Sequence, residues 1–403
     1  MQTQFNSKHP RVGSSSRKSA RVTTFSILAV FLAGLLPSGG AEADSSPTRS
    51  STSISYSNDK QESVPWSIHV VKVSRANPDY EIHSVPAKGR TIGLSTLSEQ
   101  IKSLPIDLGK PVAAINGDFW IEGRSITGDP MGLQISEGEL MSAPTDRVCF
   151  WIDTNGHPQM GLVLPLFKVT WPNGAHTLLG MNSELTNNGA VLFTPAVGPS
   201  TRTGGNTREL VLEPAGEGAW LPLAAGQAYS ARVREVRASG NGSVASGTMV
   251  LAVSAELAER LPAVAKGSLL KISMATSPNL SGVKTAIGGG PKLVHHGKPS
   301  EWNGHQERHP RSAIGWNKTH LFFVQVDGRQ RGLSVGMTFP ELTEYMVKLG
   351  CEEAMNLDGG GSSTAWVFGR VINSPCYGHE RSMANSLVLV YKDKESEKPA
   401  DPD

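Results

Sequence analysis

Short apolar runs bounded by turn residues constrain the fold of this chain most strongly. β-Branched and aromatic residues fill these runs, and Gly, Pro, Asn or Asp close them, a pattern typical of β-strands. The runs are "WSIHVVKV", "PVAAINGDFW", "RVCFWID", "HLFFVQVDG" and "NSLVLVYK". "ISEGELM" and "GWNKTHLFF" have hairpin spacing. The sequence therefore predicts a mixed α+β fold of strand-dominated sheets with few helices.

Two helices are expected. In "TFPELTEYMVKLG", Thr338 and Glu341 have capping-box spacing, apolar residues recur at helical spacing, and Gly350 supplies a stop. The second helix is expected at 95–104. The segment from about 165 to 285 is rich in Gly and Pro and short-stranded, so it is predicted to be a β-rich subdomain within a domain spanning 64–392.

The N-terminus has the order of a secretory signal. Basic residues precede "FSILAVFLAGLLP", and Ala41 and Ala43 fit an A-x-A cleavage site. The apolar run of roughly 13 residues is short for a membrane span, which needs about 20. We expect a cleaved signal at 1–43 and a secreted or periplasmic protein without a stable membrane span, with an uncleaved anchor as the alternative. Residues 44–63 are predicted to be a disordered Ser-rich leader, and 393–403 a disordered tail.

The charge balance and the cysteines further limit the kinds of protein that the sequence can encode. Lys plus Arg number 38 against 36 Asp plus Glu, so there is no basic field to attract nucleic acid. The chain has three cysteines, Cys149, Cys351 and Cys376. One disulfide between Cys351 and Cys376 is one interpretation, and three buried thiols are the other. The sequence does not indicate an oligomeric state.

The segment "NLDGGGSST", from Asn356 to Thr364, carries the most distinctive chemistry. It lacks the Lys of a phosphate-binding P-loop, does not open a helix as a dinucleotide fingerprint does, and lacks the last Gly of a nucleophile elbow. A serine hydrolase acting through Ser362 or Ser363 therefore has little support. Consecutive glycines next to Asp358 can instead bring main-chain N–H groups close to a ligand. A plain glycine-rich turn is the alternative.

Other segments carry similar polar groups at strand ends. They are "INGDFW", "AIGGGPKLV", "RHPRSAIGW", "VDGRQRGLSVGMTFPELTEYMVKLG" and "ERSMANSLVLV". "NLDGGGSST" lies between the last two of these segments. The six segments in their order along the chain resemble the phosphodiester glycosidase family over about 66–391. The resemblance implies an α+β fold with its glycine-rich loops gathered at one site. It also implies cleavage of the sugar C1–O bond in sugar 1-phosphodiesters or related envelope glycans.

That chemistry needs a carboxylate at the sugar and positive groups at the phosphate. The expected catalytic residues are Asp358, Asp327 and Arg311. The expected substrate-binding residues are Asn116, Asp118, Gly289, Gly290, Arg329, Asn356, Gly359, Gly360, Gly361, Ser362, Ser363 and Arg381. Some family members carry Gly at the position of Asp118, so a catalytic role is not assigned to it. A non-catalytic glycan-binding or exopolysaccharide-assembly protein on the same scaffold is the competing hypothesis.

No cofactor is required by this chemistry, and no metal ligands are assigned. Ca²⁺ or Mg²⁺ beside the Asp residues is compatible with the sequence. His295, His296, His305 and His309 fall within one short stretch but lack the H-E-x-x-H spacing of a metal-binding helix. They are interpreted as solvated or structural histidines.

Overall fold

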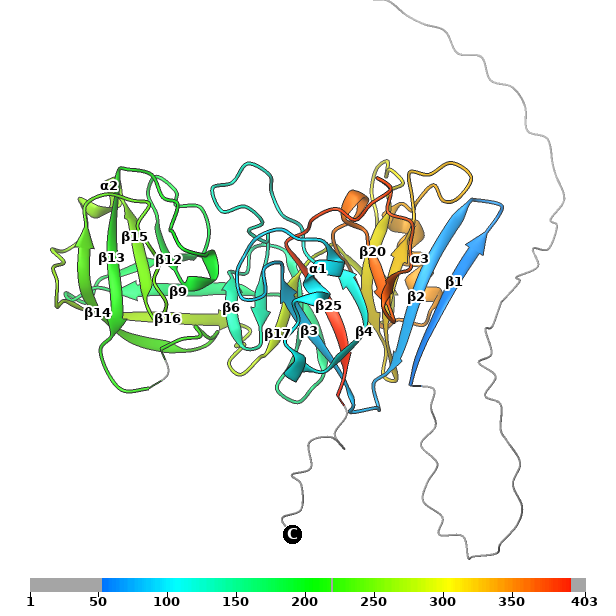
Figure 1. Cartoon of the computed structure of the whole chain (residues 1–403), viewed down its shortest axis with the longest axis horizontal. Helices are drawn as coiled ribbons and strands as arrows, with labels where there is room; N and C mark the ends of the chain where they lie inside the picture. The colour runs from blue at the N-terminus through cyan, green and yellow to red at the C-terminus, as the bar shows by residue number, and fades with distance from the viewer. Residues whose placement is uncertain (1–52, 219, 393–403) are drawn as a thin grey trace, which may run out of the picture. The chain divides into compact units, whose positions relative to one another are not determined.

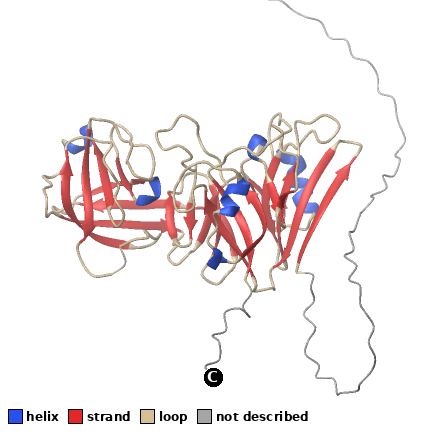
Figure 2. Cartoon of the chain, in the orientation of Figure 1, coloured by secondary structure: helices blue, strands red, loops and turns tan. Residues whose placement is uncertain are grey.

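The computed structural model describes residues 53–218 and 220–392, and strands dominate it (Figure 2). The predicted signal, the tail and the first part of the leader lie outside these residues. The predicted α+β, strand-dominated fold class is confirmed. Within the described residues, no helix is long and apolar enough to cross a membrane.

Seven antiparallel strands form the sheet that carries most of the predicted motifs. Their spatial order is β1 (Ile54–Gln61), β2 (Trp66–Ser74), β21 (His320–Val326), β20 (Arg311–Trp316), β22 (Glu353–Asn356), β18 (Lys292–His295) and β19 (Lys298–Pro299). The hairpin predicted at "GWNKTHLFF" is the β20–β21 pair. Strand β1 corrects one expectation, because residues 54–61 of the predicted disordered leader pair with β2 along their whole length.

A five-stranded sheet lies next to it in the core. Its order is β24 (Arg370–Val371), β23 (Ala365–Val367), β4 (Lys110–Asn116), β25 (Asn385–Tyr391) and β3 (Tyr80–Pro86). A second five-stranded sheet has the order β6 (Glu139–Ser142), β5 (Gln134–Ser136), β17 (Thr285–Gly288), β7 (Val148–Ile152) and β8 (Pro158–Leu162). Side chains from these sheets and the seven-stranded sheet share one buried apolar cluster, which includes Ile115, Phe150, Ile287, Ile314 and Leu387.

The remaining eight strands come from the segment predicted to be β-rich. Their order is β10 (His176–Leu178), β9 (Leu164–Thr170), β16 (Leu269–Ser277), β14 (Ala228–Arg237), β13 (Thr207–Pro214), β15 (Met249–Ser254), β12 (Ala190–Phe193) and β11 (Gly180–Met181). All neighbours are antiparallel except β11 and β12. The strands are labelled in Figure 1 where space allows.

The helices are few and short. They are α1 (Leu97–Lys102), α2 (Ala255–Ala258) and α3 (Phe339–Lys348), with 3₁₀ turns η1 (Ile106–Leu108), η2 (Pro195–Val197) and η3 (Gly360–Ser362). Both predicted helices are present, α1 within 95–104 and α3 with the complete Thr338–Glu341 capping box. Helix α3 buries Leu342, Tyr345 and Met346 against the seven-stranded sheet. All three cysteines are free, so the Cys351–Cys376 disulfide does not form.

Candidate functional site

The Asp358 loop leaves the end of β22 and turns through η3. The Asp358 amide donates to the Gly117 carbonyl over 2.9 Å, and the Gly360 amide donates to the Pro310 carbonyl over 2.9 Å. A Cβ on Gly359 would lie 2.7 Å from the Pro310 carbonyl oxygen, and Gly360 has φ +59°. Glycine is needed here because the loop backbone packs directly against the start of β20.

Buried polar side chains hold this loop in place through hydrogen bonds. The Asn116 amide nitrogen donates to the Asp358 carbonyl over 2.6 Å, and its oxygen accepts from the Ser312 hydroxyl over 2.6 Å. The Ser363 hydroxyl donates to the Arg311 carbonyl over 2.9 Å. Asn356 donates to the Gly290 carbonyl, which joins the two triple-glycine segments. Asn116, Asn356 and Ser363 are at most 1% exposed, so they position the loop and do not face solvent.

Asp118 follows β4 and is 1% exposed. One carboxylate oxygen accepts from the Phe119 amide over 2.8 Å, and the other from the Gly132 amide over 2.7 Å. A Cβ on Gly288 would lie 2.3 Å from the second oxygen. Burial raises the pKa of Asp118 to about 7, and the negative charge of Asp358 acts in the same direction. Asp118 and Asp358 therefore share one electrostatic environment.

Asp358 is the more accessible of the two carboxylates. Burial raises its pKa, while the Ser362 hydroxyl, the Gly359 amide and the charges of Arg381 and Arg147 act in the opposite direction. Its Oδ1 accepts from the Gly359 amide over 2.8 Å. Burial is the largest effect and disfavours the charge of Asp358, and hydrogen-bond donors and two arginines partly offset it.

The two arginines are held by aromatic rings. The Arg381 guanidinium carbon lies 5.0 Å from the centre of the Trp120 ring, and that of Arg147 lies 4.5 Å from the Phe119 ring. Arg381 also donates to Glu122 over 3.1 Å. The Arg147 Nε is buried and has no hydrogen-bond partner within the described residues. The charge of Arg147 lowers the pKa of both Asp118 and Asp358. An orphaned buried donor with this influence on two carboxylates is a candidate group for binding a ligand.

Arg147 is the residue that sequence reasoning missed. It stands one residue before β7 in "DRVCFW", a segment interpreted only as a strand. Strand β7 pairs with β17, which runs into the Gly288–Gly290 loop, and the Gly289 amide donates to the Val148 carbonyl over 3.0 Å. The only signal in the sequence was an arginine at a strand start, because the pairing that brings it near the triple-glycine loop is set by the fold.

Arg311, predicted to be catalytic, is used in internal contacts. Its Nε donates to the Met337 carbonyl over 2.8 Å and one terminal nitrogen to the Glu307 carbonyl over 3.1 Å. Its guanidinium carbon lies 3.9 Å from the centre of the Phe339 ring. Burial, followed by the charge of Arg329, lowers the pKa of Arg311 to about 10. Arg329 itself lies beside Gly360 and contacts His309, so these two arginines belong to another group of contacts than Asp358.

Asp327, the other predicted catalytic carboxylate, is 1% exposed. One oxygen lies 3.1 Å from the His69 Nε2, and the other accepts from the Ser374 amide over 3.0 Å and from Gln325 over 3.3 Å. Gln325 also donates to the Ser363 hydroxyl over 3.1 Å, so Gln325 connects Asp327 to the Asp358 loop. The structure therefore does not bring Asp358, Asp327 and Arg311 together in one set of contacts.

Two hollows in the described chain do not coincide with this site. One of about 330 Å³ is lined mainly by 183–187 and 201–207, and one of about 980 Å³ mainly by 73–83, 152–158 and 318–321. Neither contains a predicted site residue. The candidate site is defined by Asp358, Asp118, Arg147 and Arg381 and by the glycine loops that separate them.

Fold and site together define an α+β protein in which a buried carboxylate, Asp118, and a more accessible one, Asp358, lie among glycine-rich loops and two arginines. Residues 225–390 match the phosphodiester glycosidase family, which confirms the predicted resemblance. The matched segment includes the Asp358 loop, Gly288–Gly290 and Arg381, while Asp118 and Arg147 lie before it.

Three proteins similar to this chain are described without an activity. This chain is 34% identical to the SPbeta prophage-derived uncharacterized protein YomE of Bacillus subtilis strain 168 over 122 residues. These residues make up 29% of this chain and 19% of that protein. A hypothetical protein from Synechocystis matches with TM-score 0.67 and 18% identity, over 84% of this chain and 62% of that one. A Burkholderia pseudomallei K96243 protein provisionally described as exported matches with TM-score 0.64 and 20% identity, over 81% and 74%. These last two likenesses show the fold.

Proposed function

We propose that the protein is a hydrolase that cleaves the sugar C1–O bond of sugar 1-phosphodiesters or related envelope glycans. One observation carries the proposal: in the family-matched segment, a glycine-rich loop presents the Asp358 carboxylate to the Asp118, Arg147 and Arg381 environment. Cleavage at C1 proceeds through an oxocarbenium-like transition state, which a carboxylate stabilises as base or nucleophile.

The two carboxylates have different tasks in this scheme. Asp358 is the more accessible and acts on the sugar, either on C1 directly or on the attacking water. Both oxygens of Asp118 are bound by backbone amides, so Asp118 does not contact the substrate. With a pKa of about 7, Asp118 is largely protonated below neutral pH, and its negative charge then no longer opposes the ionisation of Asp358.

The charge of the leaving group accounts for the presence of arginines at the site. A departing phosphate monoester has a second pKa of about 6, so it leaves with little help from a general acid. Its charge instead requires guanidinium and backbone N–H donors. Arg147, with its orphaned Nε, and Arg381 are the proposed phosphate ligands.

A secreted or periplasmic location and a carbohydrate or sugar-phosphate substrate complete the proposal. The N-terminal signal pattern and the exported description of the Burkholderia relative support the location. No resident metal is required by these steps.

A panel of N-acetylglucosamine and glucose 1-phosphodiesters, incubated with the purified chain, tests the proposal. We expect sugar release from at least one substrate, and a loss of at least about 10²-fold for Asp358→Asn, the scale for removing a catalytic group. The matched control is Asp107→Asn, which changes an exposed carboxyl in η1. Equal turnover by a folded Asp358→Asn protein contradicts the proposal. Saturable glycan binding without product supports the non-catalytic alternative, which the internal roles of Asp327 and Arg311 favour.

A further inference from the structure

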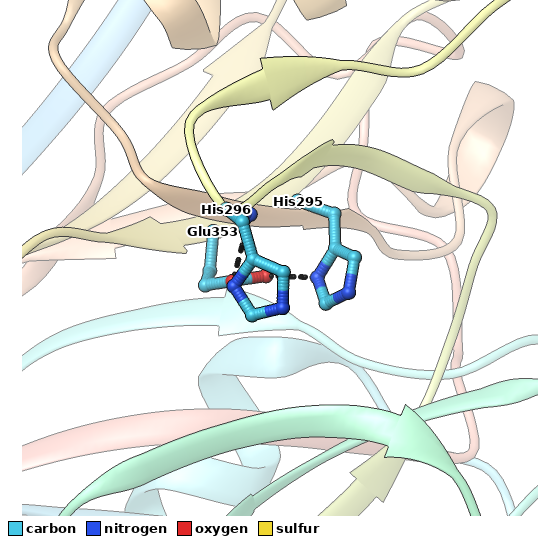
Figure 3. A group of neighbouring side chains, drawn as sticks. All are labelled: His295, His296 and Glu353. Carbon is cyan, nitrogen blue, oxygen red and sulfur yellow. Dashed lines mark hydrogen bonds and ion pairs between the residues drawn. The ribbon is translucent and has the colours of Figure 1, made fainter.

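Two adjacent histidines and one glutamate converge at the opposite end of β18 and β22 from the candidate site. His295 Nδ1 lies 2.7 Å from one Glu353 oxygen, and His296 Nδ1 lies 3.1 Å from the other. Figure 3 shows both imidazoles directed at the same carboxylate. Within the described residues this is the one group of three or more His, Cys, Asp or Glu side chains whose ligand atoms lie within 4.8 Å of one another.

The backbone creates this convergence. Successive side chains of a strand point to opposite faces, so His295 and His296 would diverge if β18 continued. His296 instead has φ +51°, and the chain turns through Gly297 into β19. The two ring centres are therefore 3.9 Å apart. The His296 amide also donates to a Glu353 oxygen over 2.9 Å, which orients the carboxylate.

We propose that His295, His296 and Glu353 bind a divalent transition metal of the zinc type. Two imidazoles and one carboxylate are a ligand set used for Zn²⁺, whereas Ca²⁺ and Mg²⁺ prefer oxygen ligands alone. Tetrahedral Zn²⁺ with bonds of about 2.0–2.1 Å holds its ligand atoms about 3.3 Å apart. The two nitrogen–oxygen separations of 2.7 and 3.1 Å are close to that value, and one ligand atom from each residue lies within 4.8 Å of the other two. The His296 side chain is 79% exposed, so water can complete the coordination.

A simple ion pair accounts less well for this arrangement. One imidazole is enough to pair with one carboxylate, and exposed pairs contribute little to stability. Here both rings turn the same atom, Nδ1, towards one carboxylate, and no other acidic side chain pairs with them in the described residues. His305 and His309, from the same His-rich stretch, are not part of the cluster.

The position of the cluster indicates a structural role. Strand β22 leads from Glu353 to the Asp358 loop, and β18 follows the Gly288–Gly290 loop. At about 3.3 Å per residue, Glu353 and Asp358 are roughly 16 Å apart along the chain. A bound metal would thus cross-link the β18–β19 hairpin to β22 and stabilise the pair of strands that carries both triple-glycine loops, without touching the substrate.

Zinc titration of the untagged full chain by calorimetry, with the Tm measured at each zinc level, tests this inference. We expect one zinc per chain and a zinc-dependent rise in Tm of a few degrees at saturation. His296→Ala and Glu353→Gln should each weaken binding at least about tenfold, because even outer partners of a metal ligand contribute that much. Glu353 is partly buried, and the exposed His296 provides a variant that leaves the core intact.

His157→Ala is the matched control, since His157 is an exposed histidine with one nearby carboxylate, Asp153. It should bind zinc and gain Tm as the wild type does. The inference is overturned if the wild type shows no saturable zinc binding, or if zinc changes the Tm of wild type and His296→Ala equally. Either result identifies the three residues as a hydrogen-bonded cluster only.

Discussion

Replacing Asp118 by Asn should change how stability depends on pH. The pKa of this buried carboxyl is raised from 3.8 in the unfolded chain to about 7 in the folded protein. The folded state therefore binds more protons than the unfolded state between these values, so the stability of the wild type falls as pH rises through this window. The amide introduced by Asp118→Asn does not titrate and removes this loss.

The magnitude follows from the shift of about three pKa units, each worth about 1.36 kcal/mol. Between pH 5 and pH 8 the wild type should lose about 2–3 kcal/mol of unfolding free energy from this group. Asn has one carbonyl acceptor for the Phe119 and Gly132 amides, which costs about 1–3 kcal/mol at every pH. The pH-dependent difference between the two proteins isolates the buried charge from this constant loss.

Urea unfolding followed by tryptophan fluorescence at pH 5 and pH 8 measures both the pH-dependent loss of stability from the buried charge and the constant loss from the substitution. The free-energy difference between wild type and Asp118→Asn should move by about 2–3 kcal/mol in favour of the variant at pH 8. The exposed Asp107→Asn variant should follow the wild type at both values. A constant difference between wild type and Asp118→Asn would refute a buried Asp118 carboxyl with a pKa near 7.

Three further changes test separate parts of the account. Arg147→Met should lower kcat/KM by roughly 10²-fold and move the titration of Asp118 to higher pH, seen in a pH–rate profile; an unchanged profile contradicts the role of Arg147. Gly359→Ala should reduce turnover in a folded protein because its Cβ meets the Pro310 carbonyl, whereas Gly205→Ala, with open space, should not. Thr338→Ala should lower the free energy of unfolding by about 1 kcal/mol and leave kcat unchanged, since it removes only the α3 cap.

Local signals in the sequence were enough to predict several of the regular elements. The Thr338–Glu341 capping box begins α3, and the hairpin spacing of "GWNKTHLFF" gives β20 and β21. Strand β1 escaped prediction because 54–61 has few apolar residues. It forms as an edge strand through backbone pairing with β2, which apolar periodicity does not report.

The candidate site was less predictable because its residues come from separate sheets. Asp358 and Asp327 look alike in the sequence, as carboxylates before glycines at strand ends. Only the fold shows that His69, Gln325 and the Ser374 amide form hydrogen bonds with the Asp327 carboxylate. In the same way, the Met337 and Glu307 carbonyls engage Arg311, while Arg147 is left with an unpartnered nitrogen.

The bond that breaks is the most direct test of the proposed function. Turnover of a sugar 1-phosphodiester in ¹⁸O-labelled water places the label on the sugar if the C1–O bond is cleaved, and on the phosphate if the P–O bond is cleaved. We predict a phosphate product without label, because the anomeric oxygen of a free reducing sugar exchanges with water and only the phosphate distinguishes the two cleavages. Turnover should be lost in Asp358→Asn. Label in the phosphate, from a preparation whose activity Asp358→Asn does not abolish, would contradict the account.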